Sequence, residues 1–110
     1  MMKRSLEALA REQLEKAASA TSGRAAHTVY GGHEHVLRQT LIALAAGQEL
    51  SEHENPGEAT VQVILGRVRL RAGDVSWEGR RGDLLVVPQS LHSLESIEDS
   101  VVLMTVAKLP

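Results

Sequence analysis

The chain has 110 residues, with one Trp, one Tyr, no Phe and no Cys. This length suits a single domain, and its core must be built from aliphatic side chains. The net charge of -2 comes from acids and bases mixed along the chain, which gives no electrostatic footprint for nucleic acid or an anionic membrane. The absence of cysteine excludes disulfides and thiolate metal sites and fits a reducing cytoplasm.

The first predicted element is an amphipathic helix over residues 5–18, in which Ser5 is suited to cap the start. One face of this helix would carry the apolar and neutral residues at helical spacing, namely Leu6, Leu9, Ala10, Gln13, Leu14 and Ala17. We expect the helix to cover one end or edge of the main domain, and a dimer contact is the alternative that the periodicity leaves open. The stretch is no unbroken apolar segment, so the sequence predicts neither a signal peptide nor a membrane span.

From residue 25 onward, short apolar runs alternate with glycine-containing breaks, as in ATVQVILG, RVRLRAG, DLLVVP and SVVLMTVAKL. Such runs at short intervals are typical of an all-β sandwich or barrel. We therefore expect residues 1–24 to form the helix and a connector, and residues 25–110 to form the barrel. In RVRLRAG the residues Arg67, Arg69 and Arg71 share one face, which we interpret as the solvated side of an exposed strand.

Two groups of glycine, proline and histidine residues give the barrel a more specific resemblance. Gly47, His53 and Gly66 fall in register with the first motif of the cupin superfamily, G-x5-H-x-H-x3,4-E-x6-G. Gly82, Pro88 and His92 resemble its second motif, G-x5-P-x-G-x2-H-x3-N, although His92 comes one residue early. The departures from both motifs are Asn55 for histidine, Ala59 for glutamate, Ser90 for glycine and Ser96 for asparagine. The resemblance implies a cupin-type jelly-roll barrel (a double-stranded β-helix) with one short N-terminal helix.

The resemblance also implies a divalent metal, such as zinc, iron, manganese or nickel, held by three histidines and a glutamate. Carried over to this sequence, it supplies His53 and His92, and Asn55 is on the same strand face as His53 because it is two residues away. An amide oxygen ligates a transition metal less well than an imidazole does. Ala59 shares the inward phase, so Glu58 is expected to point outward unless a β-bulge turns it.

The segment GGHEH places His33 and His35 before another predicted strand. We interpret them as exposed imidazoles in a loop and at a strand start. The alternative is that His35 or Gln39 faces the barrel lumen and completes a site with His53 and His92, because the sequence does not fix the phase of that strand.

We expect the protein to bind a small molecule in the barrel, with a weakly held divalent metal, because a tightly held one needs three or more protein ligands. The alternative is a metal-dependent cupin enzyme, an oxygenase or isomerase that acts on a small molecule. A lumen packed shut would indicate a purely structural module. The resemblance further implies a homodimer, and we expect a cytoplasmic protein with no nucleic-acid or membrane partner.

Overall fold

The structure is a computed structural model, and it describes residues 1–53 and 57–108. The described residues form one helix and nine strands. These are α1 (Leu6–Ser19), β1 (Arg24–Tyr30), β2 (Leu37–Leu44), β3 (Glu49–His53), β4 (Gly57–Leu65), β5 (Arg67–Ala72), β6 (Val75–Arg80), β7 (Leu84–Val86), β8 (His92–Ser96) and β9 (Ser100–Lys108). No helix among them is long and apolar enough to cross a membrane.

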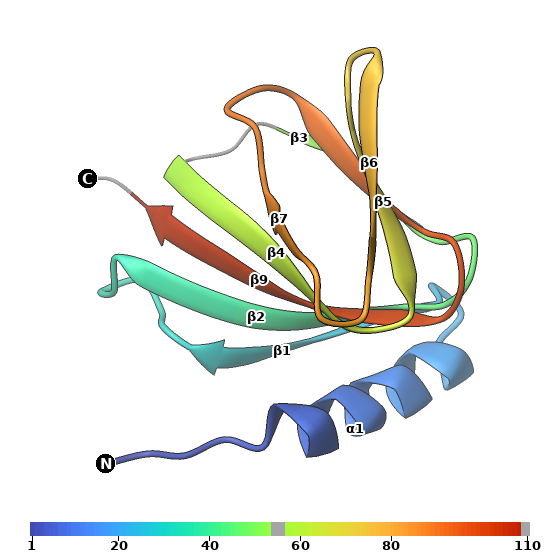
Figure 1. Ribbon diagram of the computed structural model, residues 1–110. Helices are drawn as coiled ribbons and strands as arrows, with labels where there is room; N and C mark the ends of the chain where they lie inside the picture. Colours follow the sequence, from blue (N-terminus) through green and yellow to red (C-terminus); the bar gives the residue numbers. More distant parts are fainter. Residues whose placement is uncertain (54–56, 109–110) are drawn as a thin grey trace.

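The strands form two sheets that face each other (Figure 1). The larger sheet has the order β1-β2-β9-β4-β7 and the smaller one has the order β3-β8-β5-β6. Every recorded strand pair is antiparallel. Strands far apart in the chain are neighbours, as β2 and β9 are, so the sheets are held by long-range pairing. The predicted all-β barrel with one N-terminal helix is confirmed.

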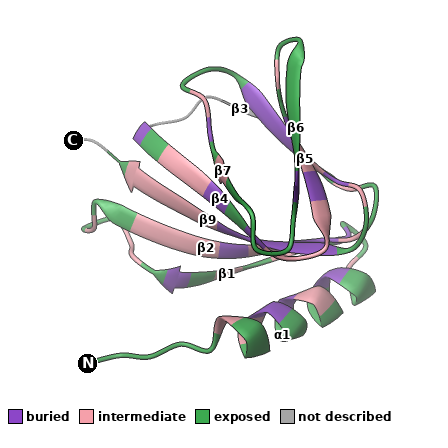
Figure 2. Ribbon diagram, viewed as in Figure 1, coloured by how far each residue is buried: buried purple, intermediate pink, exposed green. Residues whose placement is uncertain are grey.

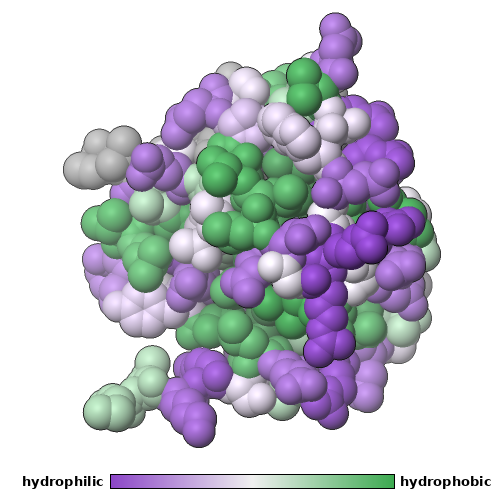
Figure 3. Space-filling model, in the orientation of Figure 1, coloured by the Kyte–Doolittle hydropathy of each residue, from purple (hydrophilic) through white to green (hydrophobic). Residues whose placement is uncertain are grey.

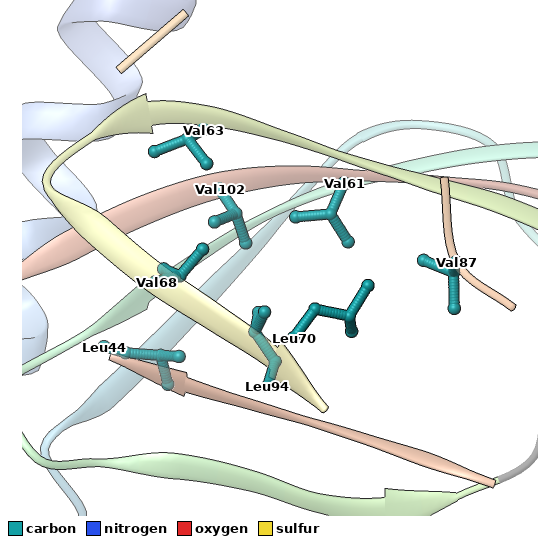
Figure 4. Close-up of a cluster of buried hydrophobic side chains, with 8 residues drawn as sticks. All are labelled: Leu44, Val61, Val63, Val68, Leu70, Val87, Leu94 and Val102. Atoms are coloured by element: carbon teal, nitrogen blue, oxygen red, sulfur yellow. The ribbon is translucent and has the colours of Figure 1, made fainter. Parts of the chain in front are cut away.

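A core of aliphatic side chains lies between the two sheets (Figure 4). Its buried members come from both sheets and are Leu44, Val61, Val63, Val68, Leu70, Val87, Leu94 and Val102. They occupy alternate positions along their strands, because successive side chains of a strand point to opposite faces. The predicted aliphatic core is therefore present.

Helix α1 packs against the outer face of the larger sheet (Figures 1 and 2). The Ser5 hydroxyl caps it by accepting a hydrogen bond of 3.2 Å from the Ala8 amide. The predicted apolar face is the one that packs, and it meets a second cluster that contains Leu41, Ala43, Val101 and Leu103. Part of the larger sheet is consequently buried on both faces.

The arginine-bearing strand β5 has one solvated face and one buried face. It lies within the smaller sheet, between β8 and β6. Glu95 and Glu78 stand opposite Arg69 on those two strands, and their carboxylates lie 3.1 Å and 4.0 Å from its guanidinium. The arginine face is solvated, as predicted, but its charge is compensated by cross-strand carboxylates. Alternation alone reveals the solvated face of a strand and not its place in the sheet.

Candidate functional site

The backbones of the two predicted histidine positions lie side by side where β3 pairs with β8. The backbone register places His53 directly opposite His92, after a shift in the register that follows Leu50. His92 is only 4% exposed. It is in phase with Leu94, which belongs to the core between the sheets, so His92 lies on the inner face of the barrel. Asn55, the third predicted ligand, lies outside the described residues.

The imidazole of His92 has a fixed hydrogen bond on one side. Its Nδ1 lies 2.8 Å from the carbonyl oxygen of Ser90. A carbonyl oxygen only accepts, so Nδ1 carries the proton and the lone pair of the neutral ring is on Nε2. Histidines that ligate metals commonly donate their other ring N–H to a carbonyl in this way, which fixes the ring and its tautomer.

Positions 58 and 59 follow the predicted alternation. Ala59 packs against the inner core, and Glu58 is exposed on the other face, opposite Ala107. Within the described part of the chain, no three histidine, aspartate or glutamate side chains gather closely enough to hold a metal ion. The donors described at this end of the barrel do not fit a tightly held metal.

The segment that contains His33 and His35 forms the connection between β1 and β2. His33 is exposed, and the His35 ring packs edge-on against Tyr30 with ring centroids 5.1 Å apart. Nδ1 of His35 lies 3.5 Å from a Glu34 carboxylate oxygen, without hydrogen-bond geometry. Gln39 points to the outer face, where its amide donates a 3.2 Å hydrogen bond to the Thr105 hydroxyl. The structure therefore does not place Gln39 in the lumen.

Three residues on the inner face of β1 and β2 were missed by the sequence reasoning, namely Thr28, Arg38 and Thr40. Thr40 stands opposite Met104, which packs against the inner core, and Thr28 stands opposite Thr40. Arg38 is two residues before Thr40 and shares its face. All three line a hollow of about 210 Å³ beside the β1–β2 connection.

A larger hollow lies elsewhere on the described surface. It has a volume of about 470 Å³ and is lined in part by Thr60, Val86, Thr105 and Ala107. These residues are in phase with Leu103, which packs beneath α1, so they belong to the outer face of the larger sheet. His92 does not line this hollow. Most of the residues that line this hollow thus lie on the face of the larger sheet opposite the predicted site.

The paired sheets with a buried histidine on the inner face define a small barrel of the jelly-roll class. Comparison with solved structures identifies its fold more closely, whereas no protein-family model and no curated protein matches the chain. A conserved protein of unknown function from Streptococcus pyogenes aligns with a TM-score of 0.73 and 24% identity, over 83% of this chain and 79% of that one. A cupin superfamily protein from Desulfitobacterium hafniense aligns with a TM-score of 0.72 and 17% identity, over 78% of each chain.

An RmlC-like cupin protein from Desulfovibrio desulfuricans aligns with a TM-score of 0.67 and 27% identity, over 76% of this chain and 81% of that one. The chain therefore has the cupin fold, as the two sequence motifs predicted. Because this fold hosts many activities, its function must be argued from the site.

Proposed function

We propose that this protein binds a small molecule at the open end of the barrel, near the start of β2 and the start of β8. The observation that carries the proposal is the buried His92 on the inner face, with its tautomer fixed by Ser90 and with His53 opposite it in the backbone register. The aliphatic core occupies the middle of the barrel, so a ligand is confined to this end. A pocket with apolar walls and a few placed polar groups suits a small organic ligand.

A divalent ion at this position would be held weakly. Its proposed ligands are the two imidazoles of His53 and His92, with Asn55 as the third predicted ligand and water in the remaining positions. Neutral imidazole suits zinc, nickel, iron and manganese to different degrees, and each ring must be deprotonated to ligate. A metal-dependent oxygenase or isomerase needs a fuller set of protein ligands, so the binding role is the one we propose.

Thermal unfolding with added zinc or nickel tests this site. At neutral pH and ten times the dissociation constant, the ion should stabilise the protein by about 1.4 kcal/mol, because it binds only the folded state. At about 4–8 °C for each kcal/mol in a domain of this size, that corresponds to a Tm increase of about 6–11 °C. The increase should be much smaller at acidic pH, where protons compete for the imidazoles.

The variants His53→Ala and His92→Ala should each abolish this increase and still fold. His33→Ala is the matched control, because it removes an exposed imidazole from the β1–β2 connection and should leave the increase unchanged. If His33→Ala abolished the metal effect and the other two variants kept it, the ligands would lie in the connection and the proposed site would be wrong.

We further propose that the protein forms a homodimer through the outer face of the larger sheet. Helix α1 covers only part of this face, and the remainder exposes Leu37, Leu84 and Val86 at 43%, 60% and 71%. Figure 3 shows hydrophobic surface in the region of β7, the strand that carries Leu84 and Val86. Exposed apolar groups gathered on one sheet face are typical of a protein–protein contact.

Light scattering at micromolar concentration should therefore return the mass of a dimer. Val86→Lys combined with Leu84→Lys should shift the protein to monomer, because two buried charges would oppose each other across a two-fold axis. Arg71→Lys, on the solvated face of the other sheet, is the control and should remain dimeric. A monomer mass for the unaltered protein would contradict this proposal.

A further inference from the structure

The inner face of the larger sheet carries a positively charged side chain, that of Arg38, near the open end of the barrel. Arg38 stands opposite Val106 on β9, and Val106 stands opposite Ala59 on β4. Ala59 packs toward the inner core, so the three residues form one inward-facing row across neighbouring strands. Strands are about 4.8 Å apart, which puts Arg38 about 10 Å from Ala59. The row therefore carries one positive charge and no carboxylate.

No described carboxylate neutralises this arginine. Four strand glutamates with a printed register, namely Glu49, Glu58, Glu78 and Glu95, are on outer faces. Glu34, four residues before Arg38 in the chain, has a side chain that is 78% exposed and lies beside His35. No ion pair joins it to Arg38 among the described residues. A half-buried guanidinium without a counter-ion favours an anionic ligand.

The guanidinium of Arg38 is held in place along one edge only. Its Nε–H donates to the His35 carbonyl oxygen at 3.3 Å, and Nη2 donates to the His33 carbonyl oxygen at 3.4 Å. Among the described residues it makes no other hydrogen bond. The remaining edge, formed by Nη1 and the second proton of Nη2, keeps two parallel N–H donors. That fork matches the two oxygens of a carboxylate.

Two hydroxyl groups add to this donor set. Thr28 and Thr40 face each other across β1 and β2, and both line the 210 Å³ hollow together with Arg38. A threonine hydroxyl can donate to an oxyanion or accept from a hydroxyl of the ligand. The hollow is smaller than the usual range for drug-sized ligands, about 300–1,000 Å³, so it suits an acid of a few carbon atoms.

The geometry points to a small carboxylic acid as the ligand of this barrel, with its carboxylate on the free edge of the Arg38 guanidinium and beside the hydroxyls of Thr28 and Thr40. This assignment rests on the proposed function, because it names the class of molecule that the open end binds. Arg38 acts as the anion-binding residue, and the carbonyl groups of His33 and His35 position it.

Isothermal titration calorimetry at neutral pH tests the assignment with malonate and its neutral analogue malonamide. Malonate should bind saturably, and malonamide should bind at least tenfold more weakly. Arg38→Gln should weaken malonate binding by about tenfold or more, as expected for a lost charge-assisted hydrogen bond. Arg38→Lys should weaken it as well, because an ammonium keeps the charge but lacks the fork.

Two further variants test malonate binding without removing the hydrogen bonds from Arg38 to the β1–β2 connection. Thr40→Val removes one hydroxyl at nearly constant shape and should weaken malonate binding severalfold. Arg71→Gln removes the same charge from the exposed outer face of β5 and should leave malonate binding unchanged. Backbone amide shifts on malonate addition should concentrate on residues 28, 31, 32, 38 and 40.

The assignment is overturned if malonate and malonamide bind equally, if Arg38→Gln and Thr40→Val bind malonate as the unaltered protein does, or if inorganic phosphate binds through Arg38 more tightly than malonate. A protein that binds no malonate but keeps its His92-dependent response to zinc would retain the proposed function and lose the carboxylate assignment. Loss of both responses in the unaltered protein would reject the two together.

Discussion

Replacing Gly66 by alanine is expected to destabilise the fold by about 2–5 kcal/mol, a large effect for the addition of a single methyl group. Gly66 joins β4 to β5 with φ at +83°, a conformation that costs an L-residue about 1–2 kcal/mol. An added Cβ would also collide with the Asp99 carbonyl oxygen and with the Ser100 hydroxyl. Overpacking of this kind costs about 1–3 kcal/mol more.

The neighbours of Gly66 are poorly able to move aside. Ser100 is 1% exposed, and its hydroxyl accepts from the Arg67 amide at 3.0 Å and lies 2.7 Å from the Glu98 carbonyl oxygen. Moving it would break the bonds that tie the β4–β5 turn to the start of β9. Since a domain of this size is stable by only about 5–15 kcal/mol, Gly66→Ala should unfold at a much lower urea concentration than the unaltered protein.

Gly47→Ala is the matched control. Gly47 has nearly the same φ of +84°, but its Cβ would meet nothing within 4 Å. Its cost should be limited to the backbone conformation, about 1–2 kcal/mol. Equal unfolding midpoints for the two variants would show that contacts with β9 add nothing to the cost of alanine at position 66.

The sequence was sufficient to predict the parts of this fold that depend on local periodicity. Residues 5–18 show an apolar face at helical spacing, and α1 occupies Leu6–Ser19 with the expected cap at Ser5. Alternation placed Ala59 inward and Glu58 outward, because strand side chains have a strict period of two. The glycine and histidine spacing indicated the cupin fold even though several ligand positions had changed.

The phase of β2 could not be predicted, and the reason is physical. Its residues 38, 40 and 42 face the barrel interior, whereas residues 39, 41 and 43 face outward, partly beneath α1. Both faces therefore mix apolar with polar side chains, and alternation gives no preference between them. Arg38 was consequently missed as a site residue, and Gln39 was considered in its place. The packing of α1 on the sheet resolves this ambiguity.

The pairing of β3 with β8 could be predicted from the sequence only in part. The two motifs brought His53 and His92 to one end of the barrel by resemblance, but the register shift after Leu50 lies within a single short strand and leaves no periodic signal. A shift of one residue changes which residue of β3 stands opposite His92. The register, rather than the spacing of the histidines, decides whether they can share a ligand.

Leu70→Ala is expected to cost about 3–5 kcal/mol, the range observed when a fully buried leucine leaves a cavity. Leu70 is 1% exposed at the centre of the core, on a strand that is paired on both sides. It stands opposite Leu94, two residues after His92 in β8, so its loss removes support from the strand that carries the proposed site. The Tm should fall by about 4–8 °C for each kcal/mol lost.

Arg69→Ala tests whether this cost belongs to the inner face or to β5 as a whole. Arg69 is the preceding residue of the same strand, and its side chain is 33% exposed on the outer face with an ion pair to Glu95. Exposed ion pairs contribute about 0.2–1 kcal/mol, so this variant should lose at most about 1 kcal/mol. Comparable losses for the two variants would mean that the face of the sheet does not matter, which would contradict a core built from alternate residues of both sheets.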